Sequence, residues 1–176
     1  MSKAVMISIQ PHWVDLIATG RKLIEIRKTK PKLNTPFKVY IYCTQDKYVR
    51  FANRDNWDGN GKIIGEFVCD EIEDMTENIV TGKGNEHIKK ESCLSGKQLN
   101  EYAQGKALFG WHISNLVIYD EPKEILSFSY PCKEDCDTCK YNRLNPWANS
   151  IEPVMMCQRD VTKAPQSWCY VEEIGT

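Results

Sequence analysis

The chain has 176 residues, of which 23 are Lys or Arg, 24 are Asp or Glu and 41% are hydrophobic. This composition supports a buried core and excludes general disorder, and no apolar run approaches the roughly 18 residues of a membrane-spanning helix. The length favours a single domain over residues 1–176. The first residues lack the apolar stretch of a secretion signal, so we expect a soluble, cytoplasmic protein.

The net charge of −1 conceals an uneven distribution along the chain. Residues 1–50 contain ten basic and three acidic residues, a net charge of +7, so the remainder carries −8. We therefore expect a basic face on a near-neutral body, whereas interleaving of the two halves would leave a mixed surface. Near-neutrality itself argues only against tight, indiscriminate binding to polyanions.

The first third of the chain predicts a strand, a helix and two further strands. Residues 3–9 form the first strand, and the helix begins at Pro11 and ends near Gly20, because proline suits the first helical position and glycine the position after the last turn. Residues 22–28 and 37–43 alternate in polarity, as strands with one buried face do. A basic, proline-containing loop joins these two strands.

The remainder of the chain predicts further strands around a short helix. Residues 62–75 predict a long strand with a bulge at Gly65, and residues 75–94 are expected to be irregular. A capping-box sequence at 95–98 begins a helix that ends near Gly105. The remaining predicted strands are 107–119, 122–128 and 167–172. Together these elements indicate an α+β fold, a mixed β-barrel with two or three short helices.

The segment around the first helix carries the motif of a known family. Residues 8–28 follow the pattern SIQPxWxxxIxxGxKxxExRK, and three later segments agree with it: IIGEFVCDEI, GWHISNLVIYDEP and PQSWCYVE. These motifs resemble the ASCH domain, a PUA-like family, over most of residues 3–130 and 165–173. The resemblance implies a PUA-like barrel whose cleft is lined by the GxKxxExR motif. It also implies a role in binding RNA or a modified nucleotide.

The alternation of a strand supports a polar cleft at this motif. Glu25 and Arg27 lie on one face of the strand and Ile24 and Ile26 on the other. Lys22 lies at the junction between helix and strand, from where it can reach the same cleft. A lysine, a carboxylate and an arginine together can bind a phosphate, a base edge or a carbonyl group. The alternative is a surface salt bridge on an edge strand, which the family resemblance disfavours.

Aromatic and polar residues elsewhere supply further binding candidates. Trp168, with Ser167, follows the entry to the last strand and is the favoured platform for stacking a base, whereas Trp13 is expected to be a core residue. Ser8 and Gln10 lie beside the start of the first helix, where they can hydrogen-bond an anion. The predicted ligand-binding residues are Ser8, Gln10, Lys22, Glu25, Arg27, Ser167 and Trp168.

Catalysis is an alternative to simple binding. One branch of the family, a bacterial acetylcytidine amidohydrolase, implies a catalytic lysine at Lys22, but Glu25 occupies the position of its nucleophilic threonine. Lys22 and Glu25 are therefore the candidate catalytic pair, acting as acid and base on an N-acylated cytidine. Ribonuclease chemistry would use lysine and arginine to stabilise phosphorane charge. A protein–protein adaptor that uses the acidic half of the chain is a third possibility.

Four of the eight cysteines cluster within residues 131–163. Four thiolates are the ligand set of a closed, structural zinc site, and metal binding would stabilise a segment that has little regular pattern. We therefore predict a zinc-binding insertion in the domain. Its predicted ligands are Cys132, Cys136, Cys139 and Cys157. Reduced structural cysteines, a disulfide and an iron–sulfur cluster are the alternatives.

Overall fold

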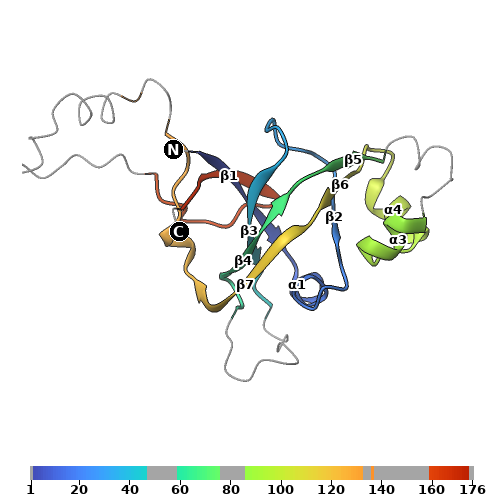
Figure 1. The fold of residues 1–176 in the computed structure, drawn as a ribbon, viewed down its shortest axis with the longest axis horizontal. Helices are drawn as coiled ribbons and strands as arrows, with labels where there is room; N and C mark the ends of the chain where they lie inside the picture. Colours follow the sequence, from blue (N-terminus) through green and yellow to red (C-terminus); the bar gives the residue numbers. More distant parts are fainter. Residues whose placement is uncertain (1, 47–58, 76–85, 133–135, 137–158, 175–176) are drawn as a thin grey trace, which may run out of the picture.

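The computed structural model describes residues 2–46, 59–75, 86–132, 136 and 159–174 (Figure 1). Within these residues the chain forms eight strands, three α-helices and one 3-10 helix. The mixture confirms the predicted α+β class with its short helices. The strands belong to two sheets, and helices α3 and α4 lie together beside the smaller one (Figure 1).

Five strands form the larger sheet, in the order β7-β4-β3-β1-β8. Its strands are β1 (Lys3–Ile9), β3 (Phe37–Cys43), β4 (Ile63–Cys69), β7 (Ser114–Lys123) and β8 (Trp168–Glu172). The pairing of β1 with β3 is parallel and the other pairings are antiparallel. A parallel pair requires a crossover connection, and here the crossover contains the GxKxxExR motif.

The smaller sheet has the order β2-β6-β5 and is antiparallel throughout. Its strands are β2 (Ile24–Arg27), β5 (Ile72–Asp74) and β6 (Phe109–His112). Two predicted long strands, 62–75 and 107–119, are therefore each divided between the two sheets. The run 107–119 stays apolar across its break at Ile113, so hydrophobicity alone did not show that change of sheet. In 62–75 the break falls at the polar pair Asp70 and Glu71, which the prediction of one continuous strand overlooked.

The described strands do not close into the barrel that the sequence predicted. Strands β7 and β8 are the outer strands of the larger sheet, and β2 and β5 are those of the smaller one. Closure requires the outer strands to pair with each other, and the described strand pairings do not join the two sheets. The expectation of a closed barrel is thus wrong for this part of the chain.

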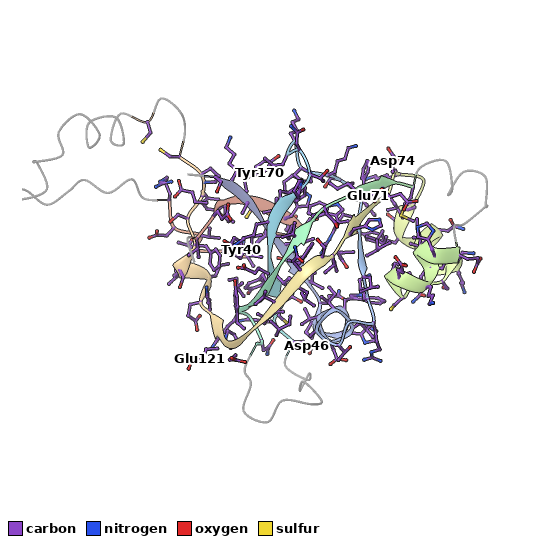
Figure 2. All side chains as sticks on the ribbon, in the orientation of Figure 1. Tyr40, Asp46, Glu71, Asp74, Glu121 and Tyr170 are labelled. Atoms are coloured by element: carbon purple, nitrogen blue, oxygen red, sulfur yellow. The ribbon has the colours of Figure 1, made fainter. Side chains whose placement is uncertain are left out.

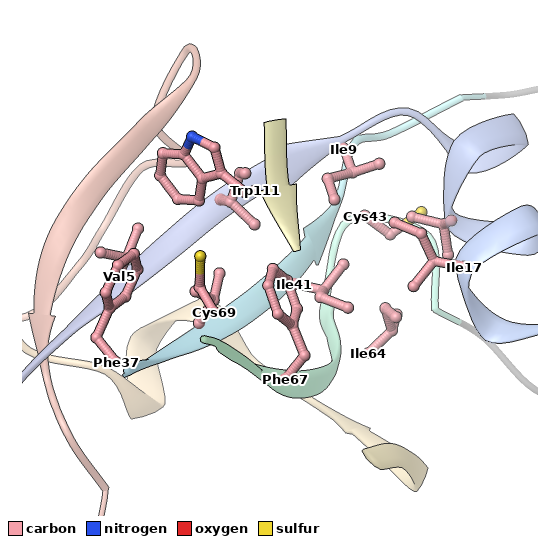
Figure 3. Close-up of a cluster of buried hydrophobic side chains, with 13 residues drawn as sticks. Val5, Ile9, Ile17, Phe37, Ile41, Cys43, Ile64, Phe67, Cys69 and Trp111 are labelled. Carbon is pink, nitrogen blue, oxygen red and sulfur yellow. The ribbon is translucent and has the colours of Figure 1, made fainter. Parts of the chain in front are cut away.

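The two sheets instead share a hydrophobic core (Figure 3). Val5 of β1, Ile41 of β3 and Phe67 of β4 are buried in one cluster with Trp111 of β6. Gly65 lets β4 approach β7 closely, because a Cβ atom there would lie 2.4 Å from the Val117 carbonyl oxygen. The strand pairing also shifts register next to Gly65, as the predicted bulge requires.

The helices agree with the predictions in two cases and differ in one. Helix α1 (Pro11–Ala18) begins at its proline, and α4 (Gly96–Ala103) begins after a complete capping box at Ser95. Helix α3 (Glu86–Ser92) lies where an irregular segment was expected. Ile88 is its one buried apolar residue, so its sequence shows no apolar periodicity.

The short strand predicted over residues 122–128 is also wrong. Strand β7 continues to Lys123, and the following residues Ile125–Ser127 form the 3-10 helix η1. Backbone hydrogen bonds from Ser127 to Glu124 and from Phe128 to Ile125 close this turn. Phe128 then packs into a second buried cluster, which contains side chains from one face of β1, β3 and β8.

Much of the cysteine-rich segment, including Cys139 and Cys157, lies outside the described residues. In the part of the chain that the structure describes, no group of three or more His, Cys, Asp or Glu side chains is arranged to hold a metal ion. The four-cysteine zinc site therefore stays a prediction. No helix among the described residues is long and apolar enough to cross a bilayer.

Candidate functional site

A cleft of about 820 Å³ lies where the end of β1, the segment from α1 to β2, and helix α4 meet. Residues 164–166, just before β8, contribute another part of its wall. Five of the seven predicted ligand-binding residues line this cleft. They are Ser8, Gln10, Lys22, Glu25 and Arg27.

Lys22, Glu25 and Arg27 form a buried chain of ion pairs. The Glu25 carboxylate forms ion pairs with both cations, with Oε2 lying 3.3 Å from Lys22 Nζ and Oε1 lying 3.0 Å from Arg27 Nη2. The side chains of Lys22, Glu25 and Arg27 are only 2%, 9% and 11% exposed. Lys22 Nζ also donates to the Ser92 carbonyl at 2.7 Å. The motif is therefore not a solvent-exposed surface salt bridge.

The local sequence explains how these side chains reach one place. In β2, Ile24 and Ile26 pack with residues of α3 and α4 on one face, which leaves Glu25 and Arg27 on the other. Lys22 precedes the strand in a turn after α1, where its backbone N–H bonds to the carbonyl of the last helical turn. The turn carries Lys22 Nζ to 5.1 Å from the ring centroid of Trp13.

Ser8 connects the motif to the end of β1 and to the segment before β8. Its carbonyl accepts a hydrogen bond from Arg27 Nη2 at 2.5 Å, and its hydroxyl donates to the Pro165 carbonyl at 2.6 Å. Its backbone N–H donates to the Ser167 carbonyl at 2.9 Å. Ser8 therefore holds three segments around the cleft, and its hydroxyl proton is already engaged within the protein.

The aromatic candidates Trp13 and Trp168 lie in different surroundings. Trp13 packs against the main core but also lines the cleft. Trp168 and Ser167 are not among the cleft-lining residues. Trp168 Nε1 donates to Thr29 Oγ1 at 2.9 Å, and its ring lies 6.0 Å from that of Trp111. A binding role for Ser167 and Trp168 stays a prediction.

Helix α4 supplies cleft residues that the sequence interpretation missed. Gln98, Glu101 and Tyr102 all line the cleft. Burial raises the pKa of Tyr102, although a hydrogen bond with Arg27 opposes that shift. The phenol is therefore protonated at neutral pH and can donate a hydrogen bond. The one signal in the sequence that helix α4 lines the cleft was a tyrosine on a mostly polar helix.

The cleft balances positive and negative charge. Two of its four charged lining residues are cations, Lys22 and Arg27, and two are carboxylates, Glu25 and Glu101. Amide side chains add both donors and acceptors, and they belong to Gln10, Gln45, Gln98 and Gln166. Such a lining suits a neutral polar group with donors and acceptors of its own better than it suits an anion.

Three single cysteines, the buried Cys43 and Cys69 and the partly buried Cys169, do not supply a reactive thiolate. Burial raises the pKa of Cys43 and of Cys69 to about 12, and that of Cys169 to about 11. All three thiols are therefore protonated at neutral pH, and a protonated thiol is a poor nucleophile. None of them lines the cleft.

Comparison with known proteins identifies the family. The ASCH domain model matches residues 7–126, so the chain belongs to the ASCH domain family, as its motifs indicated. Family membership supports an RNA-binding, PUA-like domain. None of the curated proteins matches the chain.

Among solved structures, the ASCH protein of Zymomonas mobilis is similar in fold. A tyrosine-to-phenylalanine variant of that protein aligns with a TM-score of 0.51 and 17% identity, covering 98% of this chain and 92% of that one. The protein without a stated substitution aligns with a TM-score of 0.48 and 18% identity, covering 97% and 88%. At this identity the likeness shows a shared fold and nothing about a ligand.

Proposed function

We propose that the cleft binds the base of an RNA nucleotide or of a modified nucleotide. The observation that carries this proposal is the buried Lys22–Glu25–Arg27 chain of ion pairs that lines a charge-balanced cleft. Lysine and arginine donate hydrogen bonds and the carboxylate accepts them, and a base edge offers both kinds of partner. A phosphate in the same place would lie beside the Glu25 carboxylate, which would repel it.

The size and walls of the cleft are also suited to a nucleotide base. Its volume of about 820 Å³ lies within the range of roughly 300–1,000 Å³ that small-molecule sites occupy. Trp13 and Tyr102 supply aromatic surface at the walls. Stacking of a base on such a ring contributes about 1–3 kcal/mol. The amide side chains can then select among base edges.

Substitution of Lys22 by Met is expected to weaken nucleotide binding about tenfold or more. The change keeps the long apolar stem and removes a charged donor, whose hydrogen bonds contribute about 1.5–3 kcal/mol. Gln10→Ala removes one exposed amide from the cleft and is expected to weaken binding about 2- to 10-fold. Isothermal titration calorimetry with the four ribonucleoside monophosphates and N-acetylcytidine measures both effects.

Asn100→Ala is the matched control, because Asn100 is an exposed amide on α4 that does not line the cleft. It should bind nucleotides as the wild-type protein does. The proposal fails if the wild-type protein binds none of these compounds. It also fails if Lys22→Met and Gln10→Ala bind as tightly as Asn100→Ala does.

Hydrolysis in the same cleft is the second candidate function. The 3.3 Å separation of Lys22 Nζ and Glu25 Oε2 would allow an acid–base pair to act on an N-acylated cytidine or on an RNA phosphodiester. Against this, Glu25 is already ion-paired with two cations, which favours a positioning role. The same titration mixtures can be assayed for released acetate and for cleaved RNA. Turnover that Lys22→Met abolishes would establish an enzyme instead of a binding domain.

We also propose that Cys132, Cys136, Cys139 and Cys157 hold a structural zinc ion. The two sides of the cysteine-rich segment are joined at its base, where the Tyr130 N–H donates to the Arg159 carbonyl at 2.7 Å. Ser129 and Asp160 pair beside this bond. These contacts bring the two ends of the cysteine-rich segment together, as expected for an insertion. A metal ion held by four thiolates would stabilise such a segment.

Protein purified without added zinc is expected to contain about one equivalent of zinc by elemental mass spectrometry. Substitution of Cys136 and Cys139 together by Ser should abolish metal binding, because two thiolates cannot complete a tetrahedral site. Cys169→Ser, which changes a single cysteine of β8 outside the cluster, should retain the metal. Absence of zinc from the wild-type protein would refute the site, and one equivalent of iron would indicate a cluster instead.

A further inference from the structure

The loop that follows β2 carries three lysines that have no carboxylate partner in the part of the chain that the structure describes. Lys28, Lys30 and Lys32 alternate along residues 28–33, which we call the basic loop. Among the described residues, none of these three lysines forms an ion pair, and Lys30 and Lys32 are exposed. Four other basic residues of the same region are each paired with a carboxylate. These are Arg21, Lys22, Arg27 and Lys38.

The basic loop begins at the edge of the cleft. Lys28 directly follows Arg27, and its Nζ lies 4.8 Å from the ring centroid of the cleft residue Tyr102. Lys30 Nζ lies 5.1 Å from the ring centroid of Phe109, which pairs with Arg27 across β2 and β6. The uncompensated positive charge therefore continues outward from the cleft along the end of the smaller sheet.

Two side chains of β8 anchor the basic loop, one at the Thr29 side chain and one at the Lys32 backbone. Trp168 Nε1 donates to Thr29 Oγ1 at 2.9 Å, and the Lys32 backbone N–H donates to the Tyr170 hydroxyl at 2.7 Å. Figure 2 labels Tyr170 on this strand. Pro31, between the two anchored positions, is buried. A loop that is ordered before binding loses less conformational entropy when a ligand binds to it.

The two surfaces differ in the ligand chemistry that they favour. The cleft contains equal numbers of cations and carboxylates, so it offers little net attraction for a phosphate. The basic loop offers three ammonium groups that form no ion pair among the described residues, and such groups bind a nucleic-acid backbone. A ligand that spans both surfaces must therefore combine a neutral polar ring with a chain of phosphates.

We propose that the basic loop binds the phosphodiester backbone of a single-stranded polynucleotide whose base occupies the cleft. This inference rests on the proposed function and extends it from a single nucleotide to a strand. Lys30 and Lys32 contact successive parts of the backbone. Trp168 acts as a positioning residue for the loop, through its hydrogen bond to Thr29.

The test compares the wild-type protein with the double variant Lys30→Gln/Lys32→Gln. Fluorescence anisotropy measures binding to a labelled single-stranded RNA 12-mer and to a DNA 12-mer of the same sequence, at several salt concentrations. Calorimetry measures binding to the ribonucleoside monophosphates. The double variant Lys3→Gln/Lys90→Gln is the matched control, because both lysines are exposed, have no ion pair among the described residues, and lie on β1 and α3.

The loop variant should bind the RNA 12-mer about tenfold more weakly at low salt, and the control variant should not. Each lost phosphate contact lowers the slope of log K against log salt by about 0.7 for a single strand, so the loop variant should lose about 1.4. The DNA 12-mer should show the same loss of slope, since the backbone is what the loop binds. Affinity for the monophosphates should change less than about twofold, because neither lysine lines the cleft.

The outcomes separate this inference from the proposed function. An unchanged affinity and salt slope for the 12-mer in the loop variant would overturn the inference and leave the cleft's function standing. Failure of the wild-type protein to bind the 12-mer would overturn it as well. Binding of the 12-mer that depends on Lys30 and Lys32, without binding of any monophosphate, would support backbone binding by the basic loop. It would refute the proposed role of the cleft and, with it, the placement of a base there.

Discussion

Substitution of Glu25 by Gln should lower the free energy of unfolding by about 3–5 kcal/mol. Lys22 is only 2% exposed and Arg27 is 11% exposed, and Glu25 is the carboxylate with which both pair. An amide of the same shape leaves two buried cations without a counter-ion, and burial of unpaired charge is costly. Urea unfolding at neutral pH, followed by circular dichroism, measures the change.

Asp15→Asn is the control for the loss of a carboxylate. Asp15 pairs with Arg21 at 3.0 Å, but these side chains are 35% and 60% exposed, so water screens the pair. Its loss should change the stability by less than about 1 kcal/mol. Equal urea midpoints for Glu25→Gln and Asp15→Asn would show that the Glu25 ion pairs are not buried as described.

Replacement of Trp111 by Ala should destabilise the protein by about 3–5 kcal/mol, as large-to-small changes of buried aromatic residues do. Trp111 is fully buried between the two sheets, with the Phe37 ring 5.9 Å away and the Trp168 ring 6.0 Å away. It also pairs with Glu25 across β2 and β6. Its loss should therefore loosen the cleft as well as the core, which calorimetry with nucleotides would detect.

Trp111→Phe provides a variant that is expected to fold. It keeps an aromatic ring and removes Nε1, which is buried and has no hydrogen-bond partner among the described residues. The cost should therefore fall well below that of the alanine variant. Val117→Ala, at a half-exposed position of β7, is the control and should cost less than about 1 kcal/mol. Similar stabilities for Trp111→Ala and Val117→Ala would contradict the central place of Trp111 in the core.

Most of the strands were predictable because each is either a short apolar run or a local alternation of polar and apolar residues. Strands β1 and β3 match their predicted bounds at residues 3–9 and 37–43. The division of residues 107–119 between two sheets was not predictable, whereas Asp70 and Glu71 were a polar signal for the break within 62–75. Hydrophobic pattern reports that a residue is buried, and both sheets bury their residues in shared cores. The prediction of a barrel was wrong for a separate reason, because a single sequence carries no signal for whether the outer strands of two sheets pair.

The candidate site was predictable where its residues are close in sequence. Glu25 and Arg27 share a face because they are two residues apart in a strand, and the family motif added Lys22. Ser167 and Trp168 were predicted as cleft residues because they begin the last strand, yet Pro165 and Gln166 line the cleft instead. The contribution of α4 depends on long-range packing against β2, which one sequence does not report.

The amino-acid sequence alone determined the excess of positive charge in residues 1–50, the residues of the GxKxxExR motif and the family to which they point. Only the tertiary structure decided which of those basic side chains are paired with a carboxylate and which can bind a ligand. Within the segment, Glu25 pairs with Lys22 and Arg27, and Asp15 pairs with Arg21. Two carboxylates from later in the chain, Glu66 and Glu173, pair with Lys38 and so neutralise part of the excess. Lys28, Lys30 and Lys32 receive no such partner among the described residues. Charge is a property of composition, whereas its neutralisation depends on distance, and distance is set by the fold.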